Sequence, residues 1–370
     1  MRSPYREKDI NRHIRISHGV PLAPMTTLGL GGPASVLVEL QDPADFLEFV
    51  ELARTCPGSP VCLGSGSNVL VSDLGCDSPV LRLGNRGLRI GATDAEGRAL
   101  VEVQAGHLLT DLVETVIAEG LSGMEMLAGI PGTVGATPMQ NVGAYGQEVS
   151  DTLVEVRAWD WVLGRHVTLS ARECGLGHRS SVFKRSRRWT LLSLVFALRR
   201  SELSAPVTYG AVAGVLDVPV GGRVPLADAA EAVLTVRRRK GMVMGCTETD
   251  CRSVGSVFLS PEVGPADARR LGARNAPINS FPDGSTRVSA SWLIQQAGFG
   301  LNTPIVDSVR ISSLHPTLVA DEGASATTFR EAIDIVRQQV LRRTGVGLTV
   351  EIDLLGTWHT AGRAGAPGQA

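Results

Sequence analysis

The chain has 370 residues, a length that favours two or more domains, each with its own core. Hydrophobic residues make up 43% and charged residues 20%, which excludes a disordered polyelectrolyte, a collagen and a membrane protein. With 36 basic and 37 acidic side chains, the net charge is -1, so no overall field exists to hold nucleic acid or an acidic bilayer. Any anionic ligand must therefore be bound by local groups.

The first twenty residues are polar and poorly patterned, and we expect residues 1–20 to form a loose extension. A strand is predicted over residues 35–40, and a helix over 43–54, with Asp42 as its N-cap and Pro43 in its first turn. Shorter elements follow up to residue 198. They are strands at 61–63, 69–71, 80–83, 88–90 and 100–104, a helix at 109–119, and strands at 153–159, 166–169 and 189–198.

The segment 199–210, RRSELSAPVTYG, is polar and contains a proline, which predicts a domain boundary near residue 200. We therefore expect one domain over 21–200 and a smaller α+β domain over 201–356, followed by a loose tail at 357–370. The second domain should contain helices at 226–239, 265–273, 290–297 and 328–343, and strands at 254–259, 305–311 and 348–355.

Six cysteines show no C-x-x-C pair, and no histidine follows them at zinc-site spacing, so we predict no metal site. These are Cys56, Cys62, Cys76, Cys174, Cys246 and Cys251. The charged N-terminus has no apolar signal segment, and no run approaches the roughly 18 apolar residues of a membrane span. We expect a cytoplasmic protein with reduced thiols and no membrane contact, and composition without coiled-coil heptads favours a monomer.

Residues 29–34, GLGGPA, have the spacing of a dinucleotide-binding fingerprint. A true fingerprint follows a strand and opens a helix, whereas this segment precedes the predicted strand and has Pro33 where a helix would propagate. We interpret it as a turn.

Two other glycine-rich segments are better placed to bind phosphates. Residues 64–68, GSGSN, lie between two short predicted strands, where small residues allow backbone N–H groups to approach an anion closely. A tight hairpin connection explains this spacing equally well. The second segment, AGIPGTVGA at 128–136, precedes QNVGAYG at 140–146, and two such loops together suggest an extended dinucleotide between strands.

Six stretches of the chain carry a resemblance to a known family. They are GSGSNVLV at 64–71, LAGIPGTVGATPMQNVGAYGQEV at 127–149, RSSVFK at 179–184, VTYG at 207–210, VGSVF at 254–258 and SASWLIQQAGF at 289–299. They occur in the order found in UDP-N-acetylenolpyruvoylglucosamine reductases, and the chain resembles that family from about residue 21 to 356. The resemblance implies an α+β fold with an FAD-binding PCMH domain of the vanillyl-alcohol-oxidase type, built from two α+β subdomains, and a smaller α+β substrate domain.

This family resemblance implies NADPH-dependent, FAD-mediated reduction of UDP-N-acetylglucosamine enolpyruvate to UDP-N-acetylmuramate, a step of peptidoglycan precursor synthesis. NADPH and the UDP-sugar would be the small-molecule partners. The implied FAD-binding residues are Gly64, Ser65, Gly66, Ser67, Asn68, Gly129, Ile130, Pro131, Gly132, Gly135, Ala136, Asn141, Gly143 and Ala144.

Such a reduction delivers hydride to the methylene carbon and creates negative charge on the α-carbon and its carboxylate, which must be stabilised and protonated. A guanidinium fits a carboxylate and keeps its charge, and the motif position makes Arg179 the candidate. The resemblance makes Ser256 the proton donor, although a serine there is also typical of a buried hydroxyl. It assigns Glu351 to the catalytic site, whereas strand alternation alone would place Glu351 and Asp353 on a solvated face.

Four further residues are candidates for substrate binding: Tyr209, Lys240, His315 and His178. Lys240 ends a helix, where a cation also offsets the helix dipole without any further function. The family usually has tyrosine at position 178, and a histidine there would titrate near neutrality.

Because this and other differences from the family cluster around the substrate, two alternatives stay open. One is a paralogue that reduces another enolpyruvyl or α,β-unsaturated acid. The other is a flavin-binding protein without turnover.

Overall fold

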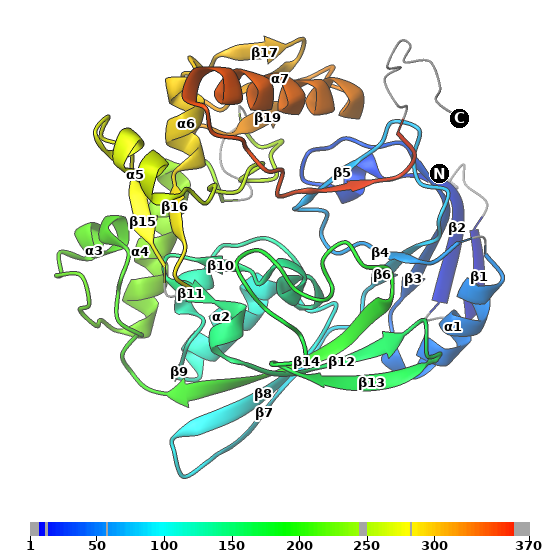
Figure 1. Ribbon diagram of the computed structural model, residues 1–370. Coiled ribbons are helices and arrows are strands. Elements are labelled where there is room, and N and C mark those ends of the chain that lie inside the picture. The colour runs from blue at the N-terminus through cyan, green and yellow to red at the C-terminus, as the bar shows by residue number, and fades with distance from the viewer. Residues whose placement is uncertain (1–6, 12–13, 57, 244–249, 282, 359–370) are drawn as a thin grey trace, which may run out of the picture.

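A computed structural model describes residues 7–11, 14–56, 58–243, 250–281 and 283–358. Its first layer is a five-stranded mixed sheet beside helix α1 (Phe46–Arg54), coloured blue in Figure 1. The expected cap is present, because the Asp42 side chain accepts a hydrogen bond from Ala44 N in the 3-10 turn η2 (Pro43–Asp45). The strand order is β1 (Glu7–Asn11), β2 (Ile14–Pro21), β3 (Pro33–Leu40), β6 (Val80–Leu83) and β4 (Val61–Cys62).

The expectation of a loose N-terminal extension is wrong for the described residues before position 21. Strand β2 pairs antiparallel with β3, so that Ile14 lies opposite Leu40 and Ile16 opposite Val38. Both isoleucines are buried and the intervening Arg15 is exposed. Apolar and polar residues therefore alternate along this strand. Burial of its apolar face forms the strand even though the segment as a whole is polar.

The second layer is a six-stranded antiparallel sheet that carries the largest core. Helix α2 (Leu109–Ala118) packs into this core through Leu109, Leu112, Val113 and Val116. Five strands follow the order β13 (Arg165–Ser170), β12 (Leu153–Asp160), β14 (Trp189–Arg200), β8 (Arg98–Gln104) and β7 (Leu88–Thr93), and β9 (Leu121–Ser122) pairs with β14.

Helices α3 (Gly210–Leu216) and α4 (Leu226–Arg239) also pack into this second-layer core. Val212 of α3 and Val233 of α4 are both fully buried there. The expected boundary near residue 200 therefore does not coincide with the division between the cores. The polar, proline-containing segment 199–210 forms a connection within the second-layer core, and its Ser204 and Val207 are fully buried.

The remaining chain builds a separate α+β core around helix α7 (Ala326–Thr344), at the top of Figure 1. The predicted strand at 305–311 is instead a hairpin, because Ser308 turns the chain with a φ of 59°. The predicted strand at 254–259 is not formed; Gly255 has a φ of 68°, and only an isolated bridge joins Phe258 to Val350. The other elements are α5 (Pro265–Gly272), β15 (Ile278–Ser280), β16 (Thr286–Val288), α6 (Ala290–Gln296), β17 (Pro304–Val306), β18 (Val309–Ile311) and β19 (Leu318–Ala320).

After α7 the chain returns to the first half of the molecule, as the red strand in Figure 1 shows. Strand β20 (Asp353–Leu355) pairs in parallel with β5 (Val69–Val71), with Asp353 beside Val69. Strand β20 is shorter than the predicted strand at 348–355. The expected tail begins bound rather than loose, since Ser72 Oγ donates to Thr357 O at 2.5 Å, while residues 359–370 lie outside the described residues.

One side chain of the first half caps a helix of the second. The Asp73 carboxylate accepts hydrogen bonds from Ala326 N at 2.8 Å and from Thr327 N at 2.8 Å, both in the first turn of α7. The Thr327 hydroxyl donates a third bond at 2.6 Å. These bonds satisfy N–H groups that a helix leaves unpaired and place a negative charge at the positive end of its dipole.

We predict that Asp73→Ala lowers the free energy of unfolding by about 1–2 kcal/mol, the usual range for loss of a helix cap. Chemical denaturation followed by circular dichroism would measure the change. Asp334→Ala is the matched control, because Asp334 lies on the same helix and forms only an exposed pair with Arg337 at 3.4 Å. It should change stability by less than about 0.5 kcal/mol. Equal effects of the two variants would contradict the capping role.

Candidate active site

A cavity of about 1360 Å³ runs between the two glycine-rich loops and the C-terminal core. Segments from both halves of the chain line it, including residues 64–68, 130–133, 253–256 and 350–355. Drug-sized ligands usually occupy pockets of roughly 300–1,000 Å³. This cavity therefore has room for an extended ligand, such as a dinucleotide with a second molecule beside it.

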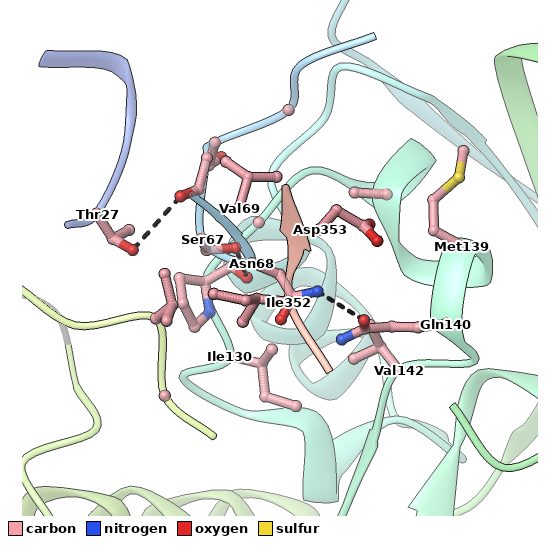
Figure 2. Close-up of a pocket in the computed structure, with 18 of the residues that line it drawn as sticks. Thr27, Ser67, Asn68, Val69, Ile130, Met139, Gln140, Val142, Ile352 and Asp353 are labelled. Carbon is pink, nitrogen blue, oxygen red and sulfur yellow. Dashed lines mark hydrogen bonds between the residues drawn. The ribbon is translucent and has the colours of Figure 1, made fainter. Parts of the chain in front are cut away.

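The loop at residues 64–68 forms one wall of the cavity and is held on both sides (Figure 2). It leaves the five-stranded sheet at β4 and enters the β5–β20 pair, so the hairpin alternative is wrong. Thr27 N donates to Gly66 O at 3.1 Å, and Asp353 N donates to Asn68 O at 3.0 Å. The Ser67 hydroxyl donates to Pro131 O at 3.2 Å and so joins this loop to the second glycine loop.

Backbone donors of both loops remain available for a ligand. No acceptor among the described residues bonds to the backbone N–H groups of residues 64–68, or to those of Gly132 and Thr133. Residues 64–68, Gly132 and Thr133 all line the cavity. Backbone N–H groups that are not paired within a protein suit phosphate oxygens, and consecutive ones form anion-binding concavities. The two loops therefore fit the diphosphate of FAD.

Two of the loop glycines are required by close contacts. Gly66 has a φ of 62°, and a Cβ there would lie 2.2 Å from Met25 O. A Cβ on Gly64 would lie 2.7 Å from Thr133 Oγ1, on the facing loop. Larger residues would displace the loop, so glycine sets how closely the walls approach.

Arg179 lies at the cavity between the second glycine loop and the C-terminal strand. Its guanidinium donates to Asn141 O at 3.0 Å and to Gly143 O at 2.7 Å, and its Nε lies 3.4 Å from Glu351 Oε1. An arginine has five N–H donors, so these contacts leave donors for an anion in the cavity. The backbone of Arg179 is left-handed, with a φ of 50°, which is unusual outside glycine and frequent at functional sites.

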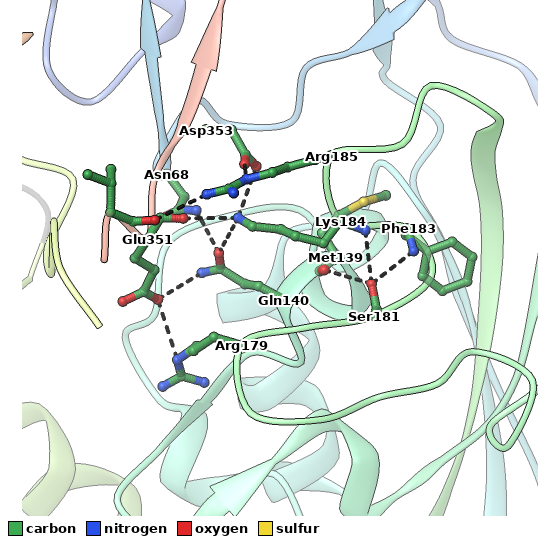
Figure 3. Close-up of polar contacts among 11 residues, drawn as sticks. Asn68, Met139, Gln140, Arg179, Ser181, Phe183, Lys184, Arg185, Glu351 and Asp353 are labelled. Atoms are coloured by element: carbon green, nitrogen blue, oxygen red, sulfur yellow. Dashed lines mark hydrogen bonds and ion pairs between the residues drawn. The ribbon is translucent and has the colours of Figure 1, made fainter. Parts of the chain in front are cut away.

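The Glu351 carboxyl lies beside Arg179 in a network that Figure 3 shows. Only 11% of its side chain is exposed, in contrast to the solvated face that strand alternation alone would predict. Burial raises the pKa of this carboxyl, whereas the charges of Arg179 and Lys184 oppose the rise. A raised pKa increases the fraction of the acid form near neutral pH, as in many catalytic carboxyls.

Lys184 connects this network to the C-terminal strand. Its ammonium donates to Gln140 Oε1 at 2.9 Å, to Glu351 O at 3.1 Å and to Asp353 Oδ2 at 3.0 Å. All three N–H donors of the ammonium are thus used. Lys184 thereby fixes the backbone at Glu351 relative to the second glycine loop.

Ser256 lines the cavity, but it lies in an exposed loop rather than in the expected apolar strand. Three contacts hold this segment. Glu351 N donates to Val257 O at 2.9 Å, Ala320 N donates to Arg252 O at 3.0 Å, and Arg252 Nε donates to Leu28 O at 2.9 Å. The structure therefore holds the backbone next to Ser256 against that of Glu351, and both residues line the cavity.

Tyr209, Lys240 and His315 line the cavity together, although they come from three separate segments. The Lys240 ammonium lies 5.6 Å from the centre of the Tyr209 ring and 5.8 Å from that of Tyr145, and the two rings meet edge to face at 5.1 Å. Burial and the charge of Lys240 lower the pKa of His315 to about 4. The group thus combines one cation with neutral polar and aromatic side chains.

His178 does not line the cavity, in contrast to its neighbour Arg179. Its ring lies 6.1 Å from that of Phe281. Burial, followed by the charges of Arg287 and Arg179, lowers the pKa of His178 to about 4. The expectation that it titrates near neutrality is therefore wrong, because sequence alone reveals neither the burial of the ring nor the nearby Arg287 guanidinium. Gly129 and Asn141 also lie outside the cavity lining.

Four cavity or network residues were missed by sequence reasoning: Gln140, Lys184, Tyr145 and Arg237. Gln140 and Tyr145 lie in the long quoted motif, and Lys184 ends RSSVFK, so their motif positions were an available signal. Arg237 is 8% exposed, and burial lowers the pKa of its guanidinium while a hydrogen bond to Tyr145 opposes this. Its helical spacing from Leu226, Ala230 and Val233 puts Arg237 on the buried face of α4, so this pattern was an available signal.

Two family models match the chain. An FAD binding domain model matches residues 34–170, and a model of the C-terminal domain of UDP-N-acetylenolpyruvoylglucosamine reductase matches residues 247–355. A reductase of that name from Salinispora arenicola is 42% identical over 339 residues, covering 89% of this chain and 93% of the relative. One from Thermobifida fusca is 40% identical over 352 residues, covering 92% and 98%.

A solved structure of UDP-N-acetylenolpyruvylglucosamine reductase from Thermus caldophilus has the same fold, with a TM-score of 0.62 at 24% identity. The match covers 95% of this chain and 99% of the other. The FAD binding domain model extends over both glycine loops, and the C-terminal domain model extends over the segments of Ser256 and Glu351. The chain belongs to the UDP-N-acetylenolpyruvoylglucosamine reductase family.

Proposed function

We propose that this protein reduces UDP-N-acetylglucosamine enolpyruvate to UDP-N-acetylmuramate, with NADPH as the reductant and FAD as the bound carrier. Family membership carries the substrate class. The observation that carries the chemistry is the arrangement of Arg179, Glu351 and Ser256 around one cavity that also contains the two glycine loops.

The two glycine loops would hold FAD, which would supply to the methylene carbon of the enolpyruvyl group the hydride that NADPH provides. This transfer moves an electron pair onto the α-carbon and its carboxylate. In the proposal, Arg179 pairs with the carboxylate, and the Glu351 carboxyl donates a hydrogen bond to the developing enolate. Ser256 then supplies the proton to the α-carbon.

At the other end of the ligand, Tyr209, Lys240 and His315 would bind the UDP-sugar. The Lys240 ammonium would pair with the diphosphate, and Tyr209 would cover it from the start of α3. Tyr209 is 42% exposed, so it has freedom to move when ligand enters. His178 is not part of this proposed site, since it faces Phe281 outside the cavity.

We further propose that the protein is a cytoplasmic monomer. The absence of coiled-coil heptads in the sequence supports a monomer. Five cysteines of the described residues are free thiols, as a reducing compartment requires. Within the part of the chain that the structure describes, no helix has the length and apolar character to cross a membrane.

An anaerobic half-reaction experiment tests the function. Purified protein with a flavin spectrum is reduced with NADPH, UDP-N-acetylglucosamine enolpyruvate is added, and flavin absorbance is followed while the product is identified by mass. Rapid reoxidation with formation of UDP-N-acetylmuramate is expected. Reduction without reoxidation would overturn the proposed substrate and favour another enolpyruvyl or unsaturated acid. Failure to be reduced by NADPH would favour a flavin-binding protein without turnover.

We predict that Gly66→Ala weakens FAD binding by at least tenfold, because the added Cβ would lie 2.2 Å from Met25 O and displace the loop. Flavin fluorescence titration of the apoprotein measures the affinity. Gly97→Ala is the matched control, since Gly97 has a similar φ of 75° but no atom within 4 Å of an added Cβ. The Gly97→Ala variant has only the backbone strain of an alanine at positive φ, which costs about 1–2 kcal/mol of stability. It should bind FAD normally. Normal binding by Gly66→Ala would contradict the loop's role.

We predict that Ser256→Ala leaves flavin reduction by NADPH within about twofold of the native rate and slows reoxidation by substrate at least a hundredfold. The reason is that only the second half-reaction needs a proton at the α-carbon, and general acids contribute roughly 10²–10⁴-fold. Stopped-flow absorbance measures the two steps separately in the same variant. Equal slowing of both steps would show that Ser256 supports the site rather than donating the proton.

A further inference from the structure

The Gln140 side chain lies between Lys184 and Glu351, and chemistry fixes the orientation of its amide. The Lys184 ammonium lies 2.9 Å from one terminal atom of this amide. An ammonium has donors only, so that atom must be the oxygen. Asn68 Nδ2 donates to the same oxygen at 2.7 Å. The amide nitrogen of Gln140 is therefore turned toward Glu351, as Figure 3 shows.

The two oxygens of Glu351 consequently have different surroundings. Oε1 accepts from Gln140 Nε2 at 3.3 Å and lies 3.4 Å from Arg179 Nε. Oε2 has no hydrogen-bond partner among the described residues, and Figure 3 shows it turned away from Gln140 and Arg179. Glu351 lines the cavity. When the carboxyl is protonated, Oε1 still accepts from Gln140 and faces the Arg179 charge, so the proton belongs on Oε2.

We propose that Gln140 is a positioning residue for the reduction: its amide holds Oε1 of Glu351 so that Oε2 carries the acidic proton and faces the substrate. The inference rests on the proposed function. It explains what orients the Glu351 carboxyl. Arg179 alone does not fix that orientation, because its guanidinium is also bonded to Asn141 O and Gly143 O. The Gln140 amide is in turn held by Asn68, a residue of the flavin loop, and by Lys184.

The same contact affects the acidity of Glu351. A donor to the carboxylate favours its ionised form and so lowers its pKa. The charged groups around Glu351 are Arg179, Lys184 and Asp353, with Arg185 bonded to the adjacent Val350 O. Removing the Gln140 donor leaves these charges in place. The pKa of Glu351 should therefore rise, and the acid form should persist to higher pH.

Two substitutions separate orientation from acidity. Gln140→Leu removes the amide. The rate of flavin reoxidation by substrate should fall at least tenfold on the plateau of its pH profile, and the fall of the rate at basic pH should move to higher pH. Gln140→Glu keeps the size and the acceptor for Asn68 and Lys184. It should be slow at neutral pH and recover as pH falls, because a protonated Glu at this position can again donate to Oε1.

Stopped-flow reoxidation between acidic and basic pH measures these profiles, and flavin reduction by NADPH should stay within about twofold in both variants. Infrared difference titration against Glu351→Gln measures the protonation of Glu351 without turnover. Gln104→Leu is the matched control, since Gln104 accepts from Asn85 Nδ2 at 2.9 Å and is absent from the cavity lining. It should have the native plateau and the native basic limb.

The outcomes are distinct. Native plateaus and limbs in both Gln140 variants would overturn the inference, and so would equal slowing of both half-reactions with a lowered melting temperature. In that second case Gln140 would support the fold only. Failure of the native protein to reoxidise with the UDP substrate would instead overturn the proposed function, while the infrared titration would still report whether Gln140 sets the protonation of Glu351.

Discussion

The parallel pairing of β20 with β5 is the interaction on which the site depends. It places Asp353 beside Val69 at the end of the flavin loop, and it continues through the bond from Ser72 N to Leu355 O at 2.9 Å. Together with the bond from Lys184 Nζ to Glu351 O, this pair sets the position of Glu351 relative to Arg179, although their chain neighbours Ile352 and Phe183 belong to different cores. The three residue pairs of this short parallel ladder therefore help to bring the flavin loop, the Glu351 carboxyl and the Arg179 guanidinium together at one cavity.

The contacts of Lys184 and Lys240 explain why these two positions carry lysine, although the other internal cations of the chain are arginines. The three acceptors around Lys184 belong to three different groups, which suits a compact ammonium with three separate donors. The Lys240 ammonium lies within 6 Å of the centres of two aromatic rings, those of Tyr145 and Tyr209. A guanidinium is planar and larger, and its fork matches one carboxylate better than several scattered acceptors.

Sequence reasoning predicted most helices closely, including 226–239, because amphipathic spacing and caps are local signals. It failed where contacts between distant segments determine the local structure. Ile14 and Ile16 lie in a charged segment but bury against β3, and the apolar run at 254–259 is turned by Gly255. Motif positions led to Arg179, Ser256 and Glu351, yet the burial of Glu351 and the neighbours of His178 depend on segments more than a hundred residues away.

The distance along the chain between the two strands has a consequence for biosynthesis. Ser72 and Thr357, which are bonded beside the β5–β20 pair, are 285 residues apart in sequence. A ribosome adds roughly 5–20 residues per second, so the glycine loop waits many seconds before its partner strand exists. The loop cannot reach its final form during most of translation. FAD therefore enters a nearly finished polypeptide, and nascent chains that stop before residue 350 should emerge unable to retain it.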